Sequence, residues 1–240
     1  MTVNWQELIR NHYATASRIS ALRNGLLQQL EDGLGGDRKT TLLATSFCSD
    51  DIVTSKDISR DVWGPFTLGG LGGLPFGGRT AMAAYAHHIP DNGTALIVYG
   101  PHIGITWQGV LGRMRRPGQS HDTSSCGALM AALEHMSSGG QEMPYVPLAR
   151  DDDQQQAYLE QSLMPFKSRI LAAPSPEKEI TEVAYALVHQ QVHRLIEATR
   201  DQFHGRRIMF VGGVIINTDA DQEDWAEIRD SGVIDLQQQR

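Results

Sequence analysis

Apolar and polar residues alternate along the chain in helix-like and strand-like patterns. Over residues 5–31 the apolar side chains recur at roughly helical spacing, until a cluster of glycines ends the pattern. Residues 41–47 and 94–99 are short, continuous apolar and β-prone runs, which is typical of buried strands. A similar run at 207–217, interrupted by two glycines, is the last predicted strand.

Helical patterns fill the intervals between these strands. Residues 79–88 form one helix, which ends at a strong turn signal, and Cys126 opens another, with Ser124 and Ser125 as capping residues. A polar stretch from residue 151 begins a third helix, and Pro174-Ser175-Pro176 begins a long one that runs to about residue 203.

This alternation of strands and helices predicts an α/β fold with a mostly parallel central sheet covered by helices. The helical pattern at the start predicts an added N-terminal helical region over residues 1–38. Residues 39–240 then form a single α/β domain, and this length can bury a sizeable core without disulfide or metal cross-links.

Charge and composition exclude several classes of protein. The net charge is −7, and the one dense basic run is Arg113-Met114-Arg115-Arg116, so a nucleic-acid binder is not expected. The first residues do not have the pattern of a signal peptide, and no window approaches 18 apolar residues. We therefore expect a cytoplasmic protein that binds neither nucleic acid nor membrane.

The candidate chemistry lies at the ends of the predicted elements. Cys48 and His102 each follow a buried strand closely, and the carboxyl ends of parallel strands are where functional residues gather. Cys126 stands at a helix start, where the helix dipole favours a thiolate. Two thiolates and an imidazole suit a catalytic zinc ion, with the fourth position left for water.

Other residues compete for these roles. His87, His88 and His121 are alternative metal ligands, and a lone cysteine is often only a small buried hydrophobe. The glycine-dense residues 69–78 lack the spacing of a phosphate-binding loop, so they predict closely packed backbone near the site. The arginines of residues 113–116 are interpreted as a solvated face.

The chain resembles the limiting-CO2-inducible B/C protein family, which is allied to β-class carbonic anhydrases. The residues that carry the likeness are Phe47-Cys48-Ser49-Asp50-Asp51-Ile52, Gly100-Pro101-His102-Ile103-Gly104 and Ser125-Cys126-Gly127-Ala128, together with residues 69–78, 87–91, 112, 118–119 and 211–218. As an ordered set these motifs are far more specific than any one of them. They lie within residues 40–135 and 207–218.

The resemblance implies zinc (Zn²⁺) on Cys48, His102 and Cys126, a β-carbonic-anhydrase-like fold for residues 39–240, and a homodimer or higher oligomer. It also implies reversible hydration of CO2 to bicarbonate. Asp50 matches the family's aspartate, which either takes the fourth metal position or moves away to admit water.

One position departs from the β-class pattern, in which an arginine follows the aspartate by two residues. Ile52 stands there, and Lys56 or Arg79 could substitute for the arginine. The departure keeps a catalytically silent, bicarbonate-binding or scaffold protein as an alternative. A hydrolase of COS or CS2 and, more remotely, a redox or nucleotide enzyme are further alternatives.

The resemblance also suggests supporting roles for other residues. Leu74 and Phe76 could line an apolar pocket for CO2, although both are equally good core residues. His88 or His121, if exposed, could relay a proton to solvent.

Overall fold

The computed structural model describes residues 3–139, 152–205 and 207–236. The helices are α1 (Trp5–Arg10), α2 (Ile19–Gln28), α3 (Thr54–Ile58), α4 (Gly78–His88), α5 (Gly127–Ser137), α6 (Gln154–Leu163), α7 (Lys167–Ala172) and α8 (Pro176–Ala198). The strands are β1 (Ser17–Arg18), β2 (Thr41–Ser46), β3 (Trp63–Thr67), β4 (Thr94–Tyr99), β5 (His102–Gly104), β6 (Arg113–Met114), β7 (Thr123–Ser124), β8 (Arg207–Asn217) and β9 (Trp225–Asp235). Single 3-10 or π turns cover Gln29–Gly33, Arg38–Thr40, Ser59–Asp61, Leu71–Gly73, Met164–Phe166 and Arg200–Gln202.

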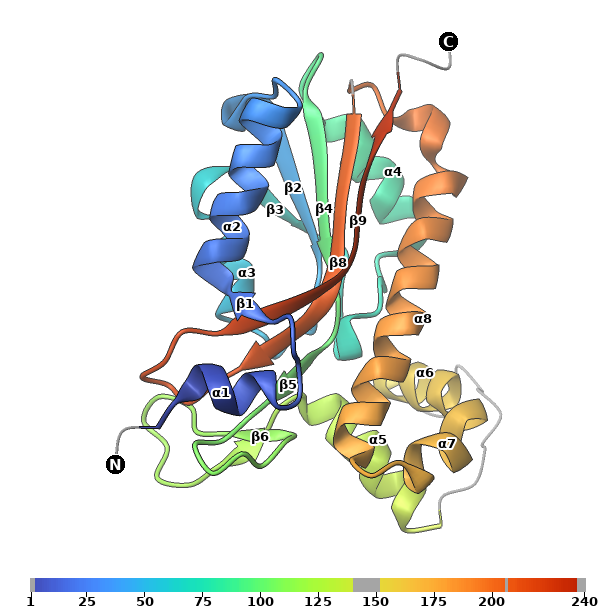
Figure 1. The fold of residues 1–240 in the computed structure, drawn as a ribbon. Coiled ribbons are helices and arrows are strands. Elements are labelled where there is room, and N and C mark those ends of the chain that lie inside the picture. The colour runs from blue at the N-terminus through green and yellow to red at the C-terminus, as the bar shows by residue number, and fades with distance from the viewer. Residues whose placement is uncertain (1–2, 140–151, 206, 237–240) are drawn as a thin grey trace.

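In the described residues the central sheet has seven strands, in the order β1-β9-β8-β4-β2-β3, with β5 paired to the second half of β8 (Figure 1). Strands β3, β2, β4, β5 and β8 are parallel to their neighbours, whereas β9 and β1 pair antiparallel at one edge. The fold is therefore α/β with a mostly parallel sheet and helical cover, as the sequence predicts.

Successive residues of each central strand point to opposite faces of this sheet, and each face has its own core. On one face Leu42 and Ala44 of β2 pack with α4 to α8. On the other face Leu43 of the same strand packs with Ile19 and Leu26 of α2. Figure 1 shows the same division, with α2 and α3 on one side of the sheet and α4 and α8 on the other.

The two longest strands that the sequence analysis missed are β9 and β3. The prediction that residues 207–217 form the last strand is wrong, because β9 follows and pairs along the whole of β8. Residues 228–235 of β9 alternate between partly buried and exposed positions and include charged side chains, so they form no continuous apolar run. Strand β3 is also largely exposed and contains Gly64-Pro65, both of which weaken a strand signal.

The first residues form two helices, α1 and α2, separated by the short strand β1, which pairs with β9. The helical pattern of residues 5–31 is therefore divided between two helices. The division of the chain into residues 1–38 and 39–240 stays a prediction.

Three predicted helices occur close to their expected bounds: α4, α5 and α8. Helix α6 begins at Gln154, and Asp151, where a helix was expected to begin, lies outside the described residues. Within the described part of the chain, no helix is long and apolar enough to cross a membrane.

Candidate metal centre

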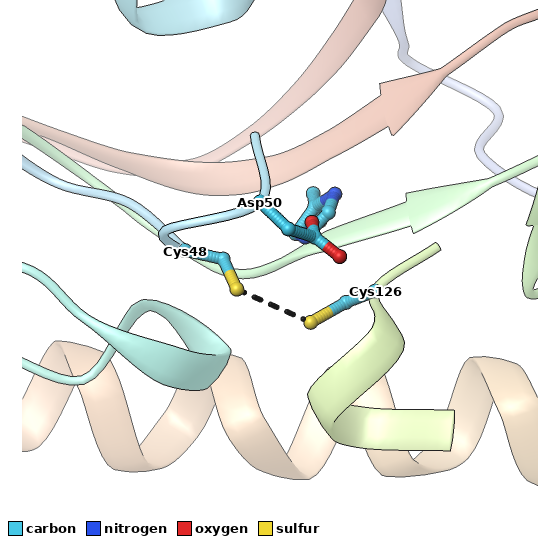
Figure 2. A group of neighbouring side chains, drawn as sticks. Cys48, Asp50 and Cys126 are labelled. Carbon is cyan, nitrogen blue, oxygen red and sulfur yellow. Dashed lines mark hydrogen bonds and ion pairs between the residues drawn. The ribbon is translucent and has the colours of Figure 1, made fainter. Parts of the chain in front are cut away.

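Four side chains that could bind a metal meet beyond the carboxyl ends of β2 and β4. Cys48 and Asp50 follow β2, His102 is the first residue of β5, and Cys126 is the N-cap residue of α5. One ligand atom of each lies within 4.8 Å of all the others. Figure 2 shows the Cys48 and Cys126 sulfur atoms facing each other, 3.3 Å apart, with the Asp50 carboxylate beside them.

The neighbouring strands determine this convergence. Because β2 and β4 run parallel and in register, the turns that follow them emerge side by side. Cys126 reaches the same place because Ser125 is tied to β5: its carbonyl accepts a hydrogen bond of 2.7 Å from the Gly104 amide.

The glycine-dense segment packs tightly against these turns, as expected. A Cβ atom on Gly69 would lie 2.3 Å from the carbonyl oxygen of Phe47, the residue before Cys48. A Cβ on Gly73, whose φ is +81°, would lie 2.6 Å from the Gly100 carbonyl oxygen. Only glycine allows backbone to approach so closely, so these residues shape the floor of the site.

His102 is held in the tautomer that a metal requires. Its Nδ1 lies 2.5 Å from Asn217 Oδ1, and the Asn217 amide nitrogen donates in turn to the Asp224 carboxylate at 3.1 Å. Because the amide nitrogen is committed to a carboxylate, Oδ1 is the acceptor, His102 Nδ1 carries the proton, and Nε2 keeps its lone pair.

The atoms that face the centre of the cluster lack ordinary partners. His102 Nε2 and Asp50 Oδ1 are buried and lie only 2.6 Å apart, so with the His102 proton on Nδ1 each directs a lone pair at the other. Buried polar atoms are nearly always paired, so this cluster fits a bound cation. Two cysteines, one imidazole and a carboxylate are a donor set that zinc accepts.

The ionisation of the cluster also favours a cation. The hydrogen bond with the Cys126 thiol lowers the pKa of Cys48 to about 4, and the same contact raises the pKa of Cys126 well above its usual value. Burial works to lower the pKa of His102, but the neighbouring cysteines and Asp50 outweigh it and raise that pKa. The lowered pKa makes Cys48 an anionic thiolate at neutral pH, which is the form of cysteine that binds a metal.

Arg116 is the functional residue that the sequence analysis placed wrongly. Its Nη2 lies 3.6 Å from Asp50 Oδ2, so Arg116 is not part of a purely solvated face. Its Nη1 donates to Thr123 and to the Ser124 carbonyl, which holds the guanidinium at the edge of the site.

Arg116 also corrects the expected substitute for the β-class arginine. Ile52 is 74% exposed, and in the described residues neither Lys56 nor Arg79 forms an ion pair with Asp50. The β6–β7 hairpin brings Arg116 to Asp50. The two residues are far apart in the sequence, so no local spacing predicts their contact.

Two other expectations for this region are wrong. Ser124 and Ser125 do not cap α5, since Cys126 is the N-cap residue and the Asp50 carboxylate accepts the hydrogen bond of the first helical amide, that of Gly127. His88 lies at the end of α4 that precedes β4, at the amino ends of the strands, and its Nδ1 bonds the Ala84 carbonyl. It is therefore at the wrong end of the sheet for a proton relay from this site.

The remaining predicted residues are divided between the core and the surface. Leu74 is buried in the same apolar cluster as Cys48 and Cys126. Phe76 instead lines a cavity of about 610 Å³ that none of the four cluster residues lines. His121 is exposed and lies outside the metal-binding group.

Comparison with known proteins gives one family. The profile of the limiting CO2-inducible proteins B/C, β-carbonic anhydrases, matches residues 20–235. No curated protein sequence matches the chain.

The solved structures that the chain resembles agree with this match. A crystal structure of PtLCIB4, a homologue of the limiting CO2-inducible protein LCIB, is 28% identical, with a TM-score of 0.85 over 96% of this chain and 95% of that one. A mutant of PtLCIB4 gives 28% identity and a TM-score of 0.87 over 98% and 95%. LCIB itself shares the fold at 21% identity, with a TM-score of 0.69 over 97% and 99%.

Proposed function

This chain belongs to the limiting CO2-inducible protein B/C family of β-carbonic anhydrases, and from this premise we propose that it catalyses the zinc-dependent, reversible hydration of CO2 to bicarbonate. The observation that carries the proposal is the convergence of Cys48, His102, Cys126 and Asp50, with His102 Nε2 and Asp50 Oδ1 buried and 2.6 Å apart. Cys48, His102 and Cys126 would hold the zinc ion.

A zinc ion in such a site lowers the pKa of a water molecule on it to about 7, the value known for carbonic anhydrases in general, and so supplies hydroxide near neutral pH. The protein's own contribution begins with His102, whose Nδ1 is fixed by Asn217 so that Nε2 points into the cluster. Such supporting hydrogen bonds orient a ligand and raise its basicity.

Asp50 is the proposed catalytic residue. Its Oδ2 accepts a hydrogen bond of 3.0 Å from the Gly127 amide and faces Arg116, while its Oδ1 faces the cluster. Arg116 would draw the carboxylate away from the metal position and so take the role that Ile52 leaves open. With Oδ2 held in this way, Oδ1 can accept the proton of the attacking water and keep its lone pair directed at CO2.

The buried apolar side of the site would receive CO2. Leu74 packs in the same core cluster as the two cysteines, so it remains the candidate for the wall of that pocket. The homodimer and the cytoplasmic location expected from the sequence remain part of this proposal.

A second candidate function is favoured by one distance. Asp50 Oδ1 lies 2.6 Å from His102 Nε2, which places the carboxylate among the metal-binding atoms. If Asp50 stays there, no position is free for water, and the protein is a catalytically silent zinc protein that binds bicarbonate or acts as a scaffold.

Stopped-flow CO2 hydration by protein of known zinc content separates the two functions, with Cys126→Ser as the blank. We expect one zinc per chain at this site and rapid turnover in the wild type, and loss of both in the variant. A wild-type protein that holds one zinc per chain at this site but hydrates CO2 no faster than the blank would overturn the proposed activity and support the catalytically silent function. A Cys126→Ser protein that retains the zinc and the activity would overturn the ligand set.

A further inference from the structure

We propose that His189, His193 and Asp230 form a second, thiol-free site for a divalent transition-metal ion such as zinc, between α8 and the sheet. This site shares no residue with the first cluster, and it does not depend on the proposed function. Its three ligand atoms, like those of the first cluster, lie within 4.8 Å of one another. Each of the three side chains is about one-third exposed, so an ion can enter from solvent.

Helix geometry places the two histidines together. They stand four residues apart in α8, on the helix face that covers the sheet, and residues at this spacing are neighbours on the helix surface. Their ring centroids are 4.4 Å apart. His189 directs Nδ1, and His193 directs Nε2, to the same point, the hydroxyl of Tyr99.

Strand register places the carboxylate opposite them. Tyr99 of β4 pairs with Gly212 of β8, and Gly212 pairs with Asp230 of β9, so the three residues form one row across the sheet. A Cβ atom on Gly212 would lie 2.3 Å from the Tyr99 ring and 2.7 Å from its hydroxyl oxygen. Because Gly212 has no side chain, the Tyr99 ring can lie across β8 and reach Asp230.

The distances fit a tetrahedral ion. Ligand atoms at about 2.0–2.1 Å from zinc stand about 3.3–3.4 Å apart along the edges of a tetrahedron. Asp230 Oδ2 lies 3.2 Å from His193 Nε2 and 3.6 Å from His189 Nδ1. Two imidazoles and one carboxylate are a common ligand set for zinc and other divalent transition metals.

Hydrogen bonds hold this group together when no ion is bound. The Tyr99 hydroxyl lies 3.0 Å from each histidine nitrogen and 3.2 Å from Asp230 Oδ2, and His193 Nε2 lies 3.2 Å from the same carboxylate oxygen. These contacts need a proton on at least one of the two imidazole nitrogens. A bound cation would replace that proton and accept the lone pairs of both nitrogens and of the carboxylate.

Cobalt titration of the metal-depleted full-length chain tests the site, because Co²⁺ replaces zinc and reports its own ligands. We expect two equivalents to bind. One, at Cys48 and Cys126, shows thiolate-to-metal charge transfer, and the other shows only ligand-field bands of imidazole and carboxylate coordination. His193→Gln and Asp230→Asn should each lose the second equivalent and keep the thiolate bands unchanged, with circular dichroism confirming the fold.

A matched control comes from the other close pair of histidines. His87 Nδ1 and His204 Nε2 are 3.1 Å apart at the surface, and the metal-binding groups of the described residues do not include them. His87→Gln should therefore leave both equivalents in place. The proposal is overturned if the wild type binds only the thiolate equivalent, or if the second equivalent survives in His193→Gln and Asp230→Asn or disappears in His87→Gln.

Discussion

The two oxygens of the Asp50 carboxylate have different surroundings. Oδ1 faces His102 Nε2 at 2.6 Å, whereas Oδ2 is held by the Gly127 amide and lies 3.6 Å from Arg116. Burial works to raise the pKa of Asp50, but His102, Gly127 and Arg116 outweigh it and lower that pKa. The carboxylate is therefore charged at neutral pH, and under the proposed function Arg116 is the cation that would draw it off the metal.

Substitution of Arg116 should separate metal binding from turnover. We expect Arg116→Gln to keep its zinc and to lose roughly 10- to 100-fold in kcat/KM, since a misplacement of a catalytic group by about 1 Å can cost about 100-fold. Arg116→Lys, which keeps the charge but not the fork of donors, should recover part of that loss. Zinc analysis and stopped-flow hydration measure the two effects.

Arg113 provides the matched control, because it lies in the same hairpin but donates to the Asp122 carbonyl instead of Asp50. Arg113→Gln should retain activity. Equal losses of kcat/KM in the Arg113 and Arg116 variants would show that the hairpin has only a structural role. Full activity in Arg116→Gln would show that Arg116 does not take part in the reaction.

The part of the site that the sequence predicts is the part that follows well-patterned elements. Cys48 and His102 stand just beyond buried strands and Cys126 begins a helix, so their grouping follows from the expected sheet. Arg116 and Asn217 are different: they meet the site only through a hairpin and through the pairing of β5 with β8. Both contacts join residues that are far apart in the sequence, so no motif spacing predicts them.

At the scale of elements, β8 joins the two halves of the site. Its first half pairs with β4 and its second half with β5, which brings Asn217 beside His102. Between β4 and β5 the chain packs closely against β8 at Gly100, where a Cβ atom would lie 1.7 Å from the Gly213 carbonyl oxygen. The position of His102 therefore depends on backbone packed against backbone.

Gly100→Ala should be strongly destabilising. We expect it to lower the free energy of unfolding by roughly 3 kcal/mol or more, because overpacking typically costs 1–3 kcal/mol and the φ of +154° adds backbone strain. Gly118→Ala is the control: Gly118 also has a positive φ, of +78°, but nothing lies within 4 Å of its Cβ position. Urea unfolding of the two variants gives the comparison, and equal losses would contradict the close-packing argument.

The two longest strands that sequence patterns missed share one physical cause. Strands β3 and β9 lie toward the edges of the sheet and expose part of their side chains, so neither carries the continuous apolar run that marks β2 and β4. Edge strands owe their place to pairing with a neighbour, and a pattern within one segment does not record that pairing. The predicted parallel centre of the sheet, formed by β2, β4 and β8, is correct although β3 and β9 were not predicted.

For the whole molecule, the apolar core extends far beyond either candidate metal cluster. Three groups of buried side chains make up this core. Two of them cover the two faces of the sheet, and the third packs α1 against β5 and the second half of β8. Cys48 and Cys126 belong to the largest of them, but it extends from Leu42 to Ile208 and includes α4 to α8. A core of this extent is expected to keep the chain folded without metal, unlike small zinc domains whose folding requires the ion.

Removal of metal should therefore lower the stability of the protein without unfolding it. After chelation and dialysis, we expect an unchanged far-ultraviolet circular dichroism spectrum and a reduced midpoint of thermal unfolding. An ion that binds only the folded chain adds about 4 kcal/mol when its free concentration is about 1,000 times its Kd, and each kcal/mol moves Tm by about 2–4 °C in a chain of this size. Added zinc should restore the midpoint in the wild type, and Cys126→Ser should recover less of it because the first site is lost. A metal-free protein with a disordered spectrum would contradict this account and would make the cluster a structural requirement of the fold.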